Sequence, residues 1–148
     1  MGCGSAGPGP DNEACERDTA PSLELGAAAD AFEPVEPGTA VELVHGSQGG
    51  YHIELAFRAT GLDPSDLAAG TLEGWVDGSL MATSSPWLQF RCNPATGTYD
   101  AWPTILVYDT EEPQSLDGVT TEVEALVVDA SGAEFTASLT LTIDDPNY

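Results

Sequence analysis

The two histidines of the chain, His45 and His52, lie on either side of a glycine-rich turn. Imidazole is the usual protein ligand of zinc and copper, so two imidazoles across one turn are a candidate metal site. Strand alternation opposes a ready-made pair, because it places His45 on the core-facing side of its strand and His52 on the outward side of the next. Two unrelated histidines are the alternative. Further ligands in nearby segments are Glu42, Glu54, Asp77 and Met81.

Clusters of carboxylates in expected loops are candidate calcium ligands, since calcium prefers oxygen donors. They are Asp63 with Asp66, Asp109 with Glu111 and Glu112, and Asp144 with Asp145. A chain this acidic contains such clusters by chance, and the sequence has no D-x-[DN]-x-[DN]-G calcium loop. We therefore expect no cofactor, and binding of copper, zinc or calcium is the alternative.

Three tryptophans form a candidate aromatic platform for sugars. Aromatic side chains dominate protein cores, so core packing is the preferred interpretation, above all for Trp75. Trp87 follows Pro86 and Trp102 precedes Pro103, so both lie beside turns and are the better surface candidates.

The charge balance excludes whole classes of partner. With 25 acidic and 3 basic residues, the formal net charge is −22. Nucleic acid binding depends on Lys and Arg that displace counterions from phosphates, so no nucleic acid partner is expected. Direct binding to anionic membrane surfaces is excluded for the same reason. Such a charge is typical of a protein that self-repulsion keeps soluble and monomeric.

No group of residues predicts catalysis. The chain has no lysine, and it lacks a G-x-S-x-G nucleophile motif. Ser/His/Asp sets and paired carboxylates can be chosen from any acidic chain and are therefore not specific. We expect a protein that is not an enzyme.

The segment Met1-Gly2-Cys3-Gly4-Ser5 resembles the processing site of bacterial lipoproteins. The resemblance implies that Cys3 is acylated, that the Gly/Pro-rich stretch after it is a flexible tether, and that the protein is exported and lipid-anchored in the cell envelope. The apolar export segment expected before Cys3 is missing, so we expect that it was removed or that the start was placed late. A cysteine that occurs by chance in a low-complexity segment is the alternative.

Once Cys3 is set aside, Cys15 and Cys92 remain as a pair. In an oxidising compartment this predicts a disulfide, which closes a loop of roughly 77 residues and contributes about 4 kcal/mol in the chain-entropy model. A thiolate metal site or a catalytic thiol is the competing interpretation, without a C-x-x-C pair to support it.

Alternating apolar residues predict the elements that position these groups. Tyr51 to Ala59 alternates without a break, and so does the last strand, from Glu134 to Ile143. A partner strand from Thr120 to Val128 is expected to join the last strand through the turn Asp129-Ala130-Ser131-Gly132. Other expected strands are Ser22–Leu25, Thr39–His45, Leu72–Met81, Trp87–Cys92 and Ala101–Tyr108, and Pro64–Ala69 is expected to form a single helical turn.

The closing hairpin, VTTEVEALVVDASGAEFTASLTLTI, resembles the final strands of bacterial Ig-like, cadherin-like and PKD-like modules. With the strand spacing, it predicts an all-β fold, an immunoglobulin-like antiparallel β-sandwich of about seven to nine strands. We expect residues 1–20 to form the lipoprotein-type N-terminus and tether, and residues 21–148 to form the sandwich domain.

A second resemblance concerns Phe32-Glu33-Pro34 and the turn from Gly46 to His52, which are similar to segments of uncharacterised predicted lipoproteins of myxobacteria. It implies export and anchoring but no activity. We therefore expect a non-enzymatic envelope module that binds a protein or glycan partner, with a membrane contact only through its lipid. A metal-binding envelope protein is the alternative.

Overall fold

The computed structural model describes Cys15 and residues 20–28, 30–46 and 50–146. These residues form twelve strands and one short 3-10 helix, which confirms the all-β class. The strand count exceeds seven to nine because five strands have only two to four residues, and the other seven are longer. The elements are β2 (Ser22–Ala28), β3 (Phe32–Glu33), β4 (Thr39–Glu42), β5 (Val44–His45), β6 (Tyr51–Thr60), β7 (Ala68–Val76), β8 (Ser79–Ser84), β9 (Trp87–Leu88), β10 (Arg91–Asn93), β11 (Thr98–Tyr108), η1 (Pro113–Leu116), β12 (Thr120–Val128) and β13 (Glu134–Asp144).

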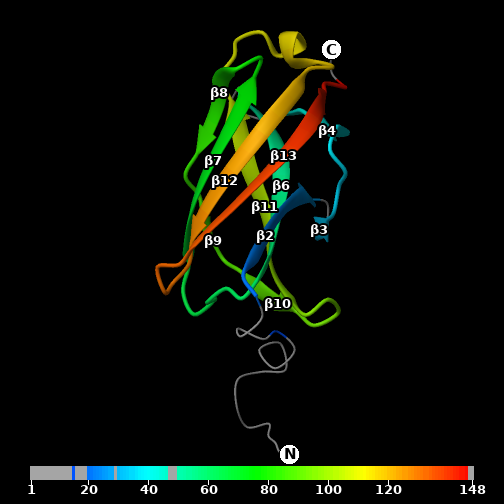
Figure 1. Cartoon of the computed structure of the whole chain (residues 1–148). Helices are drawn as coiled ribbons and strands as arrows, with labels where there is room; N and C mark the ends of the chain where they lie inside the picture. Colours follow the sequence, from blue (N-terminus) through cyan, green and yellow to red (C-terminus); the bar gives the residue numbers. More distant parts are fainter. Residues whose placement is uncertain (1–14, 16–19, 29, 47–49, 147–148) are drawn as a thin grey trace, which may run out of the picture.

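The strands form two layers, with β12 and β13 crossing over β6 and β11 (Figure 1). One layer contains β3, β2, β6, β11 and β10, and the other contains β8, β7, β12, β13 and β4. The layers join at one pair, Tyr108 of β11 with Ala82 of β8. Two short stretches of chain also pass from one layer to the other, because β4 pairs with β13 while β5 pairs with β6, and β9 pairs with β7 while β10 pairs with β11.

The core lies between the layers and follows the expected alternation. In β6, Ile53, Leu55 and Phe57 are fully buried, and in β13 the inward positions include Leu141 and Ile143. Burying apolar side chains from both layers is the main stabilising term, at roughly 25 cal/mol per Å² of apolar surface. In both strands the apolar positions of the alternation therefore face the core and the polar positions face outward.

The hairpin of β12 and β13 is confirmed, and its register pairs Val128 with Glu134 next to the turn. Asp129 organises that turn, because its carboxylate accepts hydrogen bonds from the backbone N–H groups of Asp63, Ser131 and Ala133 and from the Ser131 hydroxyl. Burial opposes ionisation of Asp129, and these hydrogen bonds overcome it, so its pKa lies below the ordinary value.

The expected strand Leu72–Met81 is wrong, since the segment forms the hairpin of β7 and β8. Asp77 and Gly78 turn the chain there with φ values of 51° and 78°. Two successive positive φ values favour Asp-Gly, a hairpin signal that apolar periodicity hides. The helical turn at Pro64–Ala69 is also wrong, because β7 already begins at Ala68, and the 3-10 helix of the described residues lies at Pro113–Leu116.

Trp75 departs from its expected place in the core. It pairs with Glu122 of β12 and Leu80 of β8, both exposed, and is half-buried on the outward face. The preceding residue, Gly74, takes the inward position, where a Cβ atom would lie 2.8 Å from the hydroxyl oxygen of Tyr108. The bulky Tyr108 therefore requires glycine at this point, and alternation turns Trp75 away from the core.

Candidate ligand-binding groove

A groove lies between β9 and β11, where the pairing along one edge of β11 is interrupted. On that edge β10 pairs with residues 98–100 and β8 pairs only with Tyr108, and in between no strand of the described residues pairs with β11. We call this hollow the β9–β11 groove, and its volume is about 340 Å³. Its lining includes Trp87, Leu88, Gln89, Arg91, Trp102 and Ile105.

Two tryptophans from different layers form the sides of the groove. Trp87 is 70% exposed and Trp102 is 39% exposed, so the preferred interpretation of core packing is wrong for both. They are the two surface candidates that the adjacent prolines indicated. Pro86 and Pro103 fix their own φ angles, which restricts the backbone beside each indole. Ile105, 44% exposed, extends the apolar surface along β11.

Arg91 supplies the positive charge of the groove. It is exposed, and its Nη2 atom donates a hydrogen bond to Oε1 of Gln89 at 3.1 Å. Asp100 lies directly opposite it in the β10–β11 ladder. Within the described part of the chain, however, no carboxylate forms an ion pair with Arg91.

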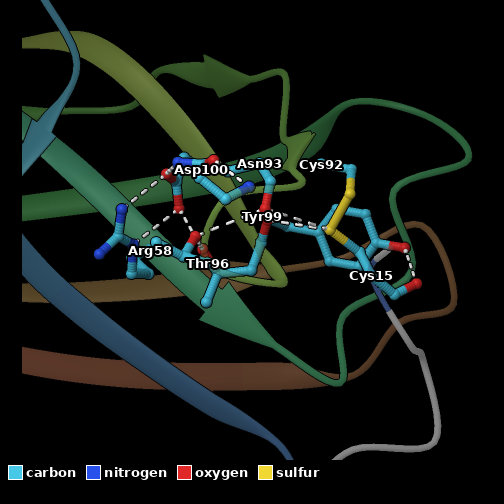
Figure 2. Close-up of a disulfide and its surroundings, with 9 residues drawn as sticks. Cys15, Arg58, Cys92, Asn93, Thr96, Tyr99 and Asp100 are labelled. Atoms are coloured by element: carbon cyan, nitrogen blue, oxygen red, sulfur yellow. Dashed lines mark hydrogen bonds and ion pairs between the residues drawn. A yellow bond between two sulfur atoms is a disulfide. The ribbon is translucent and has the colours of Figure 1, made fainter. Parts of the chain in front are cut away.

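Asp100 is bound elsewhere, in a polar network beside the groove (Figure 2). Its two carboxylate oxygens accept bonds from Nε and Nη2 of Arg58, each at 3.0 Å. Asn93 and Thr98 donate two more. Asp100 is only 1% exposed, and burial opposes its ionisation, but Arg58 and the other donors overcome this and lower its pKa. The Arg58 guanidinium also lies 4.3 Å from the centre of the Phe32 ring, a cation–π contact.

The Cys15–Cys92 disulfide is confirmed and lies at the end of the same network (Figure 2). The Cα atoms are 5.8 Å apart, and Cys15 is buried in the core although it precedes the first described strand. The buried hydroxyl of Tyr99 donates a hydrogen bond to the backbone carbonyl of Cys15 at 3.1 Å. These bonds fasten Cys15 to β10 through the disulfide and to β11 through Tyr99, next to Arg91.

The two histidines are neighbours in the ladder but do not face one another. Tyr51 pairs with His45 and Val44 pairs with His52, and paired residues share a face, so the two imidazoles point to opposite faces. His45 Nε2 lies 2.9 Å from Oδ1 of Asp145, and its ring meets the Tyr51 ring edge-on.

The structure therefore does not bring the two imidazoles together. His52 Nε2 lies 3.7 Å from Oε2 of Glu54, whereas Asp77 and Met81 belong to the layer opposite β6. No three His, Cys, Asp or Glu side chains among the described residues gather as metal ligands do. The zinc or copper site stays a prediction.

Two of the three acidic clusters contain carboxylates with partners of their own in the described residues. Asp145 is buried beside His45, and its backbone N–H donates a hydrogen bond to Oδ1 of Asp117. Asp63 accepts a hydrogen bond from the N–H of Ser65 and donates its own N–H to Asp129. Calcium binding likewise stays a prediction.

The expected lipidation site, Cys3, lies outside the described residues. The one helix that the structure describes, η1, has four residues and cannot cross a bilayer.

Arg91, Gln89 and Asp100 were missed from the sequence. Composition held a signal for Arg91, because a chain with three basic residues leaves few cations to place. Asp100 is one of 25 acidic residues, and nothing in its local sequence distinguishes it.

No protein-family model and no curated protein matches the sequence. Among solved structures, the chain is similar to the CooA pilin subunit from enterotoxigenic Escherichia coli, with 9% identity and a TM-score of 0.36. The match covers 83% of this chain and 99% of the pilin subunit. A TM-score of this size is too low to establish a common fold, and the pilin's role does not transfer to this chain.

Proposed function

We propose that this chain is a non-enzymatic module of the cell envelope that binds a protein or glycan partner through the β9–β11 groove. The observation that carries the proposal is the pair of exposed tryptophans, Trp87 and Trp102, which line one groove from two different layers. Indole rings provide large contact areas with little conformational freedom to lose, so exposed tryptophans in one groove favour a binding surface.

The strand order supports an immunoglobulin-like identity for the module. In that fold one sheet has the order A-B-E-D and the other contains C, F and G. Here β2, β6, β11 and β10 follow the first order, and β7, β12 and β13 follow the second, with β8 added beside β7. The parallel pairing of β4 with β13 adds an early strand to the second sheet.

The disulfide supports an oxidising compartment, since disulfides persist in exported proteins and are rare in the cytosol. Anchoring through a lipid on Cys3 completes the proposed localisation. Expression of the gene with its native upstream region tests the anchor. The Cys3→Ser variant is expected to leave the membrane fraction, and retention of that variant in membranes would refute lipidation.

The lining of the groove supports binding rather than catalysis. Among the described residues it contains no His, Cys, Asp or Glu, the groups that general acid–base and nucleophilic catalysis use most. Asp100 lies in an adjoining hollow, but Arg58, Asn93 and Thr98 already bind its carboxylate.

Calorimetric titration of the full chain tests the groove as a binding site. The probes are hexamers of neutral sugars, hexamers of uronic acids and ten-residue extended peptides. Trp87→Ala and Trp102→Ala are each expected to weaken the binding of an active probe about tenfold, the effect of losing one aromatic contact worth about 1.4 kcal/mol.

Trp75→Phe is the matched control, because Trp75 does not line the groove and lies toward the end of β7 that is opposite to its pairing with β9. Failure of all probes to bind, or binding that survives both alanine variants, would count against the groove.

A further inference from the structure

The inference concerns the chemical class of the ligand and rests on the proposed binding function. We infer that the β9–β11 groove binds a polysaccharide rich in uronic acids, with a sugar carboxylate on Arg91 and sugar rings against Trp87 and Trp102. Three observations carry it: the charge of Arg91, which no carboxylate of the described residues pairs, the composition of the groove and the interruption of the β11 edge.

Among the described residues, Arg91 is the arginine that no carboxylate pairs. The described residues include two arginines. The guanidinium of Arg58 binds Asp100, whereas Arg91 forms no ion pair with any described residue. The carboxylate opposite Arg91 is that same Asp100, whose oxygens are occupied by Arg58, Asn93 and Thr98. A guanidinium has five N–H donors, so the one hydrogen bond to Gln89 orients Arg91 and leaves a bidentate edge for an external carboxylate.

The groove tolerates an anion although the net charge of the chain is −22. The described residues that line it include no carboxylate, and the charge of the nearby Asp100 is neutralised by Arg58. Charges farther away are screened over a Debye length of about 8 Å at physiological ionic strength. A ligand carboxylate at Arg91 therefore meets a positive charge and no unpaired carboxylate among the described lining residues.

The rest of the groove matches a sugar. The faces of two indoles suit the apolar C–H faces of pyranose rings, while the exposed side chain of Gln89 can hydrogen-bond to hydroxyl groups. The two tryptophans and Arg91 come from three strands, β9, β11 and β10, so a ligand that contacts all of them must extend across the groove. A chain of several sugar units meets that requirement.

An extended peptide fits less well, because the edge of β11 is a poor template for an added strand. The register between β11 and β6 shifts between Ala101 and Thr104, and Pro103 has no N–H to donate. Bulges and prolines are the devices by which sheet edges avoid pairing with another chain. The backbone of β11 is thus protected where a peptide would need it.

A matched pair of ligands tests the inference. The full chain is titrated with hexamers of galacturonic acid, mannuronic acid and glucuronic acid–N-acetylglucosamine, and with the carboxyl-reduced form of each. We expect at least one acidic hexamer to bind ten or more times tighter than its reduced form. Arg91→Gln should remove this preference, Arg91→Lys should retain part of it, and Trp75→Phe should leave it unchanged.

Three other outcomes overturn the inference, and the first two of them leave the proposed function standing. Equal, tryptophan-dependent binding of acidic and reduced hexamers means a neutral glycan ligand, and the groove keeps its function. Binding of the extended peptides alone, again lost in Trp87→Ala, means a protein partner. No binding by any sugar or peptide overturns the inference and the proposed function together.

Discussion

Arg91 and Asp100 lie opposite one another in the ladder of β10 and β11, but the Asp100 carboxylate binds Arg58 of β6 instead. Asp100 is buried and Arg91 is exposed. The buried carboxylate therefore pairs with Arg58, whose side chain is also partly buried. A bidentate Arg–carboxylate pair in a partly buried place is stronger than an exposed one, which explains the choice. The same choice leaves Arg91 facing the groove.

Replacement of Asp100 by Asn should destabilise the fold strongly. It removes one partner of a buried ion pair and leaves Arg58 without compensation, which costs about 3 kcal/mol. Urea unfolding measures the loss. Glu24→Gln is the matched control, since Glu24 also lies opposite Arg58 but is exposed, and it should change the free energy of unfolding by less than about 0.5 kcal/mol. Equal effects of the two variants would show that the Arg58–Asp100 pair contributes little.

The contribution of Asp100 also predicts an acid limit. Its pKa in the folded chain is lowered, so its stabilisation is fully present above the pKa of the unfolded state, near 3.9, and is lost as the pH falls through the folded value. The difference in unfolding free energy between the native chain and Asp100→Asn should be constant from pH 7 to 5 and should shrink below about pH 4. A difference that already narrows at pH 6 would contradict this assignment.

Loss of the disulfide should lower the free energy of unfolding by about 4 kcal/mol in the chain-entropy model. The double variant Cys15→Ser/Cys92→Ser and the reduced native chain should unfold at similarly lower urea concentrations. Cys3→Ser keeps the crosslink and is the control. Intact-mass measurement after alkylation should modify Cys15 and Cys92 only once the protein is reduced, and labelling of both before reduction would refute the bond.

Tyr108 predicts an alkaline limit. Burial raises its pKa to about 12, although the hydrogen bond with Thr121 acts in the other direction. The unfolded chain releases this proton near pH 10, so the stabilisation holds below pH 10 and is lost as the pH rises toward 12. Between pH 9 and 11.5 the native chain should lose about 2 kcal/mol more unfolding free energy than Tyr108→Phe. Thr121→Val, which leaves Tyr108 buried, should behave as the native chain does, and a Tyr108→Phe variant with the full alkaline loss would disprove the assignment.

Thermal melts with EDTA, Ca²⁺, Zn²⁺ and Cu²⁺ test the metal hypothesis. An ion at a hundred times its Kd adds about 2.7 kcal/mol of stability, enough to move the melt by several degrees. Because the imidazoles of His45 and His52 point to opposite faces, we expect no zinc or copper shift that both His45→Ala and His52→Ala abolish. Such a shift would restore the paired-histidine site, and a shift with calcium alone would indicate the acidic clusters.

Much of the fold could be predicted where one physical signal acts alone. The unbroken alternation of β6 and β13 predicted their faces, because one side of each strand meets the core. The failures occur where a local backbone signal competes with apolar content. Leu72–Met81 reads as one apolar strand, yet Asp77 and Gly78 turn it, and the inward Gly74 turns Trp75 outward.

The groove was less accessible to sequence reasoning than the strands. Proline neighbours made Trp87 and Trp102 the better surface candidates, although core packing was preferred. Only the order of the strands brings these two residues, fifteen positions apart, to one groove. The role of Arg91 depends on a carboxylate of β11 that binds β6, a relationship that no local pattern encodes.

The disulfide has a mechanical consequence. Cys15 and Cys92, separated by 77 positions, enclose β2 through β9 in a covalent loop. Tension applied to the chain outside this loop passes through the two sulfur atoms and cannot extend the strands within it. If the chain were tethered by its N-terminus and held a ligand at Arg91, the force would pass from Cys15 through the disulfide to Cys92. Cys92 is joined to Arg91 by one peptide bond. Covalent bonds would then carry the force between tether and ligand, and the hydrogen bonds between the strands inside the loop would not be loaded.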